Sequence, residues 1–465
     1  AGLRRPAQRK AREAAVRGLR HLAQRRELQE SMWASSQVQS ALVRNAALPG
    51  EGEAPAREAA LGALGALSRN AWNLHGIWFE GRARQALVKA AAGRGPGDRR
   101  ARDYALEALQ NVAFSRKGME TMLKDADASR ALVSAAGCND TDDELARDLS
   151  LATLELLSSD AKNRKALWTS ASGARAALVS AARAPARTSG PGAERARVFS
   201  LCALKNLAAD DANRQVMWDT EGSRRALVGA ALGVERPRRL AGAARASDEG
   251  PHGPGELQRD AGDCALEALR NLALHPGNGR GIWADRSGAR AALLQAAAHG
   301  GSEERRSLGL QGLRLLAGAE SAEEMWRDEA TRSALIRAAS LEGGADRELQ
   351  REALEALLQL SAVEPNRAPM WRDAQARRAV VRAAQLVRPE DRASREAALG
   401  TLRNLAMEPA NRAPMWQASS DARAALVAAA QLKEPEDRKA RLYAVLALQK
   451  LAAAAGNKRT MWRGG

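Results

Sequence analysis

The sequence predicts an all-α fold, a right-handed α-solenoid of about ten three-helix units, on the basis of three observations. A large apolar residue, usually Trp preceded by Met, returns at a spacing close to 45 residues. The apolar residues between these positions follow helical spacing, and no stretch alternates as a strand does. Aromatic residues form only 3% of the chain although hydrophobic residues form 45%, which favours thin, closely packed helices over a bulky globular core.

Nine tryptophans mark equivalent places in successive units, and Leu123 fills the one vacant place. Counted in this way, successive places are 43–50 residues apart, except for 65 residues between Trp218 and Trp283, and Trp72 alone lies outside the register. The second helices carry Ala, so a large side chain is needed to fill the space between units, and we predict that these rings form the structural core. A row of stacking platforms for nucleic-acid bases is the alternative. The nine residues are Trp33, Trp78, Trp168, Trp218, Trp283, Trp326, Trp371, Trp416 and Trp462.

Three helices are predicted within each unit, as its last complete copy illustrates. In the first helix, Asn411 is expected to cap a short turn that carries Met415 and Trp416. The second helix is expected from Asp421 to Leu432, and the third and longest from Arg438 to Ala454, because both have apolar residues at helical spacing.

The domain organisation predicted is one repeat array over residues 1–465 that starts and ends within a unit. The segment Ala11 to Ala23 matches the third-helix segment Ser394 to Ala406, and the chain ends just after Met461 and Trp462. Two insertions, 184–194 and 234–256, fall between second and third helices, and the Gly- and Pro-rich second one is predicted to be a disordered loop.

The formal net charge of +17 and the pI of about 10.6 point to nucleic acid or an acidic protein surface as partner. Arg, Ala and Gly are all abundant, so the composition of a GC-rich genome is an alternative source of the charge. No apolar run is long enough for a membrane span.

The three cysteines, Cys138, Cys202 and Cys264, predict neither a disulfide framework nor a zinc site, because they are odd in number and lack a C-x-x-C pair. Cys202 and Cys264 lie in apolar helices, where a free Cys acts as a small core residue. A reducing intracellular compartment is therefore expected, with the cytoplasm favoured. The Arg-rich stretch Arg4 to Arg26 leaves organelle import as the alternative.

Four sequence elements recur at fixed places in the units. A Gly follows soon after the Trp in several units, an Ala-Leu-Val segment comes next, and the third helix carries a version of A-L-x-N-L-A, as in Ala268 to Ala273. The fourth is an Asn five residues before the Trp, at Asn73, Asn163, Asn213, Asn278, Asn366, Asn411 and Asn457. With these elements the unit resembles the armadillo repeat over essentially the whole chain, and the HEAT repeat is a near neighbour.

The resemblance implies a concave groove lined by the third helices, in which Asn side chains hold an extended peptide. By position, the groove residues are Asn111, Asn206, Asn271 and Asn404, with the basic neighbours Lys205, Arg270 and Arg403. Nuclear-import members of the family also carry a Trp four residues before this Asn. Here Glu107, Cys202, Glu267 and Gly400 occupy that place, so a receptor for nuclear-localisation signals is not expected.

Residues for chemistry are not apparent in the sequence. The five His residues form neither metal-ligand spacing nor a triad pattern, so we expect no catalytic residue, metal, cofactor or small-molecule substrate. The predicted function is a non-catalytic scaffold whose groove binds another protein. The partner could belong to a large complex. An RNA-binding solenoid, or a basic structural subunit of a large protein or ribonucleoprotein assembly, is the alternative.

Overall fold

The computed structural model describes residues 6–138, 140–169, 173–183, 191–233, 260–318, 320–342, 344, 346–417 and 421–463. Within these ranges every regular element is a helix and none is a strand, so the fold is all-α, as the sequence predicts.

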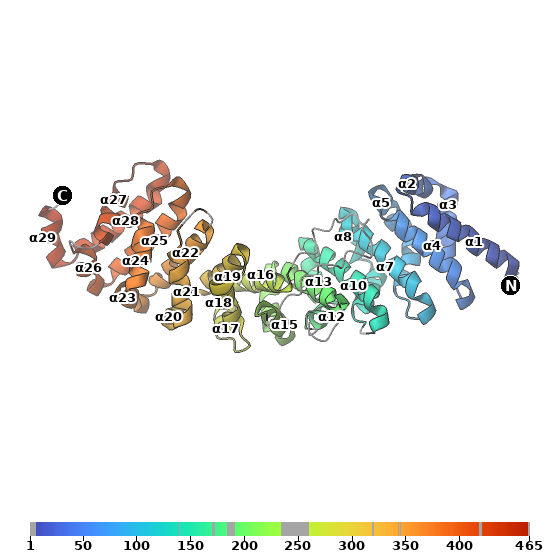
Figure 1. Cartoon of the computed structure of the whole chain (residues 1–465), viewed down its shortest axis with the longest axis horizontal. Coiled ribbons are helices and arrows are strands. Elements are labelled where there is room, and N and C mark those ends of the chain that lie inside the picture. The colour runs from blue at the N-terminus through green and yellow to red at the C-terminus, as the bar shows by residue number, and fades with distance from the viewer. Residues whose placement is uncertain are drawn as a thin grey trace. The chain divides into compact units, whose positions relative to one another are not determined.

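The helices follow a cycle of a short first, a medium second and a long third helix (Figure 1). The first helices are α2 (Arg26–Ala34), α5 (Ala71–Phe79), α8 (Arg116–Met122), α11 (Ala161–Thr169), α14 (Asp211–Asp219), α17 (Gly279–Trp283), α20 (Ala322–Arg327), α23 (Glu364–Arg372), α26 (Pro409–Trp416) and α29 (Ala455–Arg463). The second helices are α3 (Ser36–Ala46), α6 (Gly81–Ala91), α9 (Ala126–Ala136), α12 (Ala174–Ala182), α15 (Glu221–Ala231), α18 (Ala289–His299), α21 (Glu329–Ala339), α24 (Ala374–Ala384) and α27 (Asp421–Ala430).

The third helices are the longest of each cycle. They are α1 (Pro6–Ala23), α4 (Ala54–Leu67), α7 (Arg99–Phe114), α10 (Glu144–Ser159), α13 (Pro191–Ala208), α16 (Ala261–Ala273), α19 (Glu303–Leu316), α22 (Arg347–Ala362), α25 (Arg392–Met407) and α28 (Arg438–Ala452). Short 3-10 turns are η1 (Glu51–Glu53), η2 (Pro96–Asp98), η3 (Thr141–Asp143), η5 (Pro276–Asn278), η6 (Pro389–Asp391) and η7 (Pro435–Asp437).

The chain forms two compact units, residues 1–268 and 269–465. Consecutive third helices pack against each other within each unit. In the first, α1, α4, α7, α10 and α13 form such a series, and in the second, α19, α22, α25 and α28 do. Second helices also follow one another, as α21, α24 and α27 do.

The Asn of the first helix joins one cycle to the next. Asn411 is buried, and its Nδ2 donates to the carbonyl oxygen of Leu405 in its own preceding third helix (3.0 Å) and to that of Arg367 in the previous first helix (3.0 Å). The expectation that Asn411 caps its helix is wrong, because Glu408 is the N-cap and accepts from the Ala410 N–H. The same pair of bonds, with Nδ2 to oxygen distances of 2.9–3.1 Å, is made by Asn73, Asn163, Asn213, Asn366 and Asn457.

The Arg that follows this Asn completes the end of the third helix. Arg412, for example, donates to the carbonyl oxygens of Ala406 (3.2 Å) and Met407 (3.0 Å). The last carbonyls of a helix have no partner within the helix, so these guanidinium groups act as C-terminal caps.

Ion pairs join the N-terminal ends of neighbouring third helices. Arg347, the first residue of α22, bonds Asp391 with an Nε to Oδ1 distance of 2.8 Å. Arg57 and Arg102, which lie one turn further into α4 and α7, pair with Asp98 and Asp143. In each pair the acid lies about one repeat after the Arg, at the start of the next third helix. The hydrogen bond from Arg102 lowers the pKa of Asp143.

The predicted boundaries hold except at helix ends and around the insertions. The second and third helices of the last copy end at Ala430 and Ala452, two residues before the predicted ends, because the final residues form turns instead. Residues 234–256 lie outside the described residues, as do 184–190. The rest of the first predicted insertion, residues 191–194, belongs to α13, which begins at Pro191, a residue that the first turn of a helix accommodates.

The cysteine prediction is wrong for two of the three residues. Cys202 of α13 and Cys264 of α16 are joined by a disulfide, with their Cα atoms 5.2 Å apart. Both side chains are buried, as expected for core residues, but adjacent third helices bring them within bonding distance. The spacing along the chain, 62 residues, hides this neighbourhood. The inference of a reducing compartment loses its basis, and Cys138 is the one free cysteine.

Candidate functional site

The third-helix Asn residues were predicted to hold a peptide, and the structure places three of them in bonds between neighbouring third helices. Nδ2 of Asn111 donates to Ser68 Oγ (2.9 Å) and Nδ2 of Asn206 to Ser158 Oγ (3.0 Å). Each Ser belongs to the preceding third helix or its last turn. An amide has two N–H donors and one acceptor oxygen, so one bond to Ser does not exhaust either side chain.

Asn404 is more fully engaged than the other two. Its Nδ2 donates to Ser361 Oγ (3.0 Å) and to the carbonyl oxygen of Leu358 (3.3 Å), and its side chain is buried. Asn271 is also buried, and its Oδ1 accepts from Arg270 Nη1 (2.9 Å). These two amides therefore contribute to packing within the second unit.

The three basic groove residues each contact the next third helix. The Lys205 ammonium lies 3.5 Å from Glu267 Oε2, and Arg270 Nε donates to Gln311 Oε1 (3.1 Å). The Arg403 guanidinium lies 5.5 Å from the centroid of the Tyr443 ring. All three side chains remain half-buried at the surface, because solvent covers their other side.

The predicted groove residues are not brought together as one continuous row. In the first unit Asn111 and Asn206 are separated by α10, which carries Leu156 at the equivalent place. In the second unit α19 and α22 lie between Asn271 and Asn404, with Leu315 and Gln359 at that place. The face is instead a series of contacts between neighbouring helices.

A sequence signal for the Ser–Asn pairs exists but was missed. The Ser lies two residues after the Asn place of one cycle, and an Asn follows in the next cycle after each of Ser68, Ser158 and Ser361. Ala occupies the Ser place in the other cycles, and of these only the cycle with Ala208 precedes an Asn, Asn271. The occurrence of Asn therefore depends on its neighbour.

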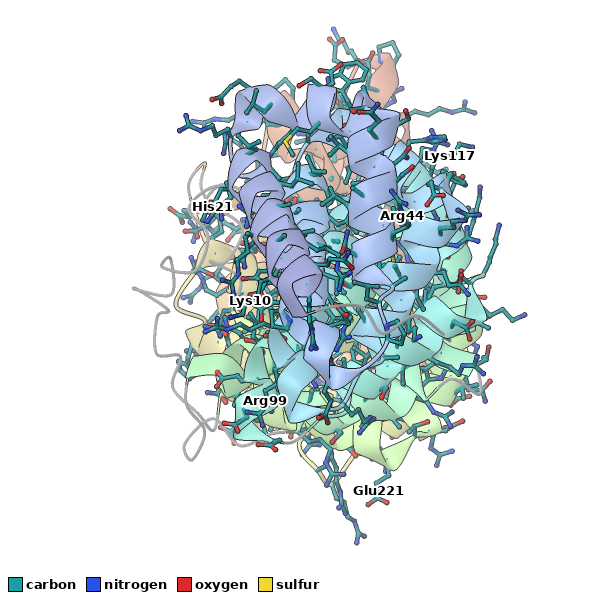
Figure 2. All side chains as sticks on the ribbon, turned by 90° about the vertical axis from the view of Figure 1, so that its right-hand side faces the viewer. Lys10, His21, Arg44, Arg99, Lys117 and Glu221 are labelled. Atoms are coloured by element: carbon teal, nitrogen blue, oxygen red, sulfur yellow. A yellow bond between two sulfur atoms is a disulfide. The ribbon has the colours of Figure 1, made fainter. Side chains whose placement is uncertain are left out.

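Charged side chains on the third helices, or just after their ends, also pair across cycles. Arg69 donates to Glu107 Oε1 from Nε (2.9 Å) and Nη2 (2.7 Å), and Arg314 Nε lies 2.6 Å from Glu352 Oε2. Cationic side chains are not confined to this face, since Lys10, Arg44, Arg99 and Lys117 project on different sides of the first unit (Figure 2).

The tryptophans of the register are buried wherever the structure describes their side chains. Trp78 and Trp168 are each 1% exposed, and the side chain of Trp462 lies outside the described part. An Arg near the start of the following second helix covers seven of these rings, with Cζ 4.6–5.8 Å from the ring centroid. These rings are therefore covered by protein rather than presented to solvent.

The indole N–H of several tryptophans reaches the next first helix. Trp78 donates to Thr121 Oγ1 and Trp416 to Thr460 Oγ1, both at 2.8 Å, and Trp283 donates to Glu324 Oε2 at 3.0 Å. Gly76 occupies the same place facing Trp33, and a Cβ on it would lie 2.4 Å from the Trp33 Nε1. In these four cases the residue two places before the register position bonds or makes room for the previous ring, whereas Trp168 Nε1 has no partner among the described residues.

Asp148 is the described acid whose pKa departs most from its usual range, and it lies on α10. Burial raises its pKa to about 6, although Arg195 Nε bonds its Oδ2 at 2.8 Å and opposes the rise. Its Oδ1 has no hydrogen-bond partner among the described residues. This environment favours the neutral acid, and Asp148 belongs to no group of three potential metal ligands among the described residues.

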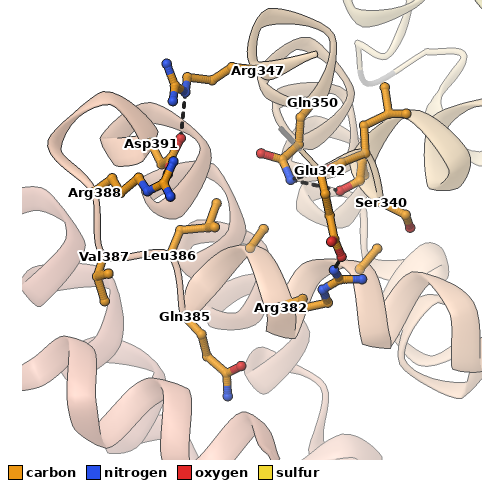
Figure 3. Close-up of a pocket in the computed structure, with 14 residues that line it drawn as sticks. Ser340, Glu342, Arg347, Gln350, Arg382, Gln385, Leu386, Val387, Arg388 and Asp391 are labelled. Atoms are coloured by element: carbon orange, nitrogen blue, oxygen red, sulfur yellow. Dashed lines mark hydrogen bonds and ion pairs between the residues drawn. The ribbon is translucent and has the colours of Figure 1, made fainter. Parts of the chain in front are cut away.

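A pocket of about 420 Å³ opens between the α21–α22 and α24–η6 connections (Figure 3). Its polar side chains bond one another: Glu342 with Arg382, Asp391 with Arg347, and Gln350 Nε2 with the carbonyl oxygen of Leu341 (2.9 Å). The remaining wall is largely Ala and Leu. The pocket is a gap between cycles in which two of the three lining arginines, Arg347 and Arg382, are paired with carboxylates.

Neither a metal site nor a membrane span is found in the part of the chain that the structure describes. No three His, Cys, Asp or Glu side chains there are grouped so that they could hold a metal ion. No described helix combines the length and the apolar character that crossing a bilayer requires.

Comparison with known proteins gives a fold relation only. No protein-family model and no curated protein matches the chain. A crystal structure of an engineered protein from the Northeast Structural Genomics Consortium is similar with a TM-score of 0.68 and 17% sequence identity, over 95% of each chain. At this identity the likeness extends to the fold and not to function.

Proposed function

We propose that this chain is a right-handed α-solenoid of about ten armadillo-like cycles and serves as a non-catalytic scaffold that binds another protein. The observation that carries the architecture is the bond repeated by the first-helix Asn. In one cycle after another, as with Asn366 and Asn411, the amide bridges the previous first helix and its own third helix. Such nearest-neighbour contacts build an extended surface rather than a closed active site.

The third-helix face is the binding surface of this proposal. Arg270 and Arg403 are half-buried there, and their contacts to Gln311 and Tyr443 fix their positions. Side chains held in place by neighbours lose little further freedom on binding, which favours affinity. The same face would contact RNA in the alternative function, for which the net charge of +17 is the supporting observation.

Charge reversal on this face tests the proposal. We expect the R270E/R403E variant to lose most of one partner protein that is recovered with the wild-type chain at moderate salt, and to bind the purified partner at least tenfold more weakly in calorimetry. The matched control is R372E/R378E, whose side chains are exposed on α23 and α24. This control should bind as the wild type does.

An RNA function predicts a different result. Affinity for a labelled single-stranded RNA would fall with log[salt] at a slope of about 0.7 per neutralised phosphate. A slope equivalent to several phosphates that disappears in R270E/R403E would replace the protein partner with RNA.

A further inference from the structure

One first helix, α5, has an aromatic stripe on its solvent face. The helix buries Asn73, Leu74, Ile77 and Trp78 against its neighbours. On the other side Trp72 is 81% exposed, Phe79 is 43% exposed and His75 is exposed. These three residues are separated by three and four positions, so they lie along one side of the helix.

The stripe is particular to this cycle. Across the other first helices the three equivalent places hold no aromatic residue. They are, for example, Glu27, Glu30 and Ala34 in α2, Lys117 and Glu120 in α8 with Lys124 just after it, and Lys162, Lys165 and Thr169 in α11. Only 15 of the 465 residues are Trp, Tyr or Phe, from counts of 10, 2 and 3. Exposed aromatics concentrated on one helix differ from the scattered apolar residues of an ordinary surface.

Cations flank the stripe on one side. The helices α2, α5 and α8 follow one another along the upper edge of the blue and cyan part of Figure 1, and α11 is joined to α8 by the bond from Asn163 to the Met119 carbonyl oxygen. Arg116 and Lys117 of α8 are 89% and 67% exposed, and Lys117 projects on the side of the first unit away from His21 (Figure 2).

The next helix, α11, adds two more exposed cations, Lys162 and Lys165. Neither forms an ion pair with any residue that the structure describes, whereas Arg116 and Lys117 share Glu120. The α8 and α11 side of the stripe therefore carries an excess of positive charge.

We propose that α5 with the flanking cations of α8 and α11 is a docking surface for an acidic segment of a partner protein. Trp and Arg dominate the binding energy of protein interfaces, especially where an aromatic ring enters an apolar pocket of the partner. An apolar side chain of the segment contacts Trp72 and Phe79, and its carboxylates face Lys117, Lys162 and Lys165. This surface is separate from the third-helix face and does not depend on it.

Nucleic acid fits the surface less well. Glu27 and Glu30 of α2 border the other side of the stripe, and Glu120 follows Lys117 on α8, so a phosphate backbone would meet carboxylates. The His75 and Phe79 rings also pack on each other, with centroids 4.4 Å apart. One side of each ring is thereby unavailable to a stacked base.

A random peptide library tests this surface without knowledge of the partner. Displayed 16-residue peptides are selected on the wild-type chain and counter-selected on W72A. We expect the enriched peptides to be rich in Asp and Glu and to share an aromatic or branched aliphatic residue. The absence of Trp72-dependent enrichment, or enrichment of basic peptides, overturns the proposal.

An enriched peptide, labelled with fluorescein, then gives affinities by anisotropy. We expect W72A and K117E/K162E each to weaken binding at least tenfold, W72F to retain most of it, and E27K/E30K to strengthen it. The control reversal R82E/K89E, at exposed places on α6, should leave the affinity unchanged. Equal loss in the control would mean that only net charge is recognised and would overturn the site.

Two further measurements separate this proposal from the others. The R270E/R403E variant should bind the peptide as the wild type does, so failure of the third-helix proposal leaves this one standing. A labelled 20-nucleotide RNA should show no Trp72-dependent affinity. Tight, salt-sensitive RNA binding that W72A abolishes would assign the stripe to nucleic acid instead.

The melting temperature of W72A should equal that of the wild type, because the ring is exposed.

Discussion

The asparagines of the first helices and those of the third helices differ in the kind of hydrogen-bond partner that they have. The first-helix Asn, such as Asn411, recurs in most cycles and bonds two backbone carbonyls, whose presence does not depend on any side chain. The third-helix Asn, such as Asn404, occurs irregularly and bonds a Ser in the previous cycle. The first-helix Asn recurs because its partners are backbone carbonyls, which every cycle has. The third-helix Asn occurs mainly where the previous cycle supplies a Ser side chain.

The register tryptophans, like the first-helix Asn, recur in most cycles. Replacing one of them should have the largest effect on stability. We expect W371A to lower the free energy of unfolding by about 3–5 kcal/mol, because a buried ring leaves a cavity between cycles. Protection from hydrogen exchange should fall first in α23, α24 and α25. The matched variant W72A should change stability by less than about 0.5 kcal/mol. A large effect of W72A, or none of W371A, would contradict the assignment of the two rings.

Replacement of a constant Asn should come next. N411A removes both donors, so the carbonyl oxygens of Arg367 and Leu405 lose their hydrogen bonds from the Asn411 side chain. We expect a loss of about 2–3 kcal/mol in chemical denaturation. The control N404A should cost less. If the two variants were equally destabilised, the distinction between the two sets would fail.

A third kind of buried polar group, Asp148, should show an effect that depends on pH. Burial raises its folded pKa to about 6, above the ordinary value of 3.8, so between these values the folded state binds more protons than the unfolded state. Stability from this group therefore rises as pH falls from 7 to 4, on the order of 2 kcal/mol, and is lost as pH rises through 6.

The variant D148N does not titrate and supplies the comparison. The difference in unfolding free energy between wild type and D148N should grow in favour of the wild type as pH falls. Asp143, whose pKa is lowered by Arg102, should give the opposite trend below its ordinary pKa. A difference that is flat between pH 7 and 4 would show that Asp148 is solvated.

The smallest effect on stability is expected for the Ser–Asn pair of neighbouring third helices. A double-mutant cycle of S361A and N404A should give a coupling energy of about 1 kcal/mol. The same pair can be built where it is absent, at residues 113 and 156. We expect A113S/L156N to be less destabilised than the sum of its single changes. Strict additivity in both places would mean that the Ser–Asn bond contributes nothing.

The sequence predicted the repeated helices, but it did not predict the contacts between neighbouring cycles. The three-helix cycle follows from a period near 45 and from helical spacing, both of which are local signals. The role of Asn411 was misassigned because Asn near a helix start is ordinarily a cap, and its partner, the Arg367 carbonyl, lies one cycle away. The groove prediction placed Asn404 correctly on its helix, but only the packed structure shows that Ser361 and Leu358 occupy its donors. The α5 stripe was overlooked because Trp72 falls outside the register.

The disulfide between Cys202 and Cys264 is a second covalent connection between the parts of the chain before and after residues 203–263. Every peptide bond between these two residues is bypassed, because α13 and α16 stay joined through sulfur even when the chain between them is cut. A protease that cleaves within residues 234–259 would therefore yield two fragments that migrate as one species until a reducing agent is added.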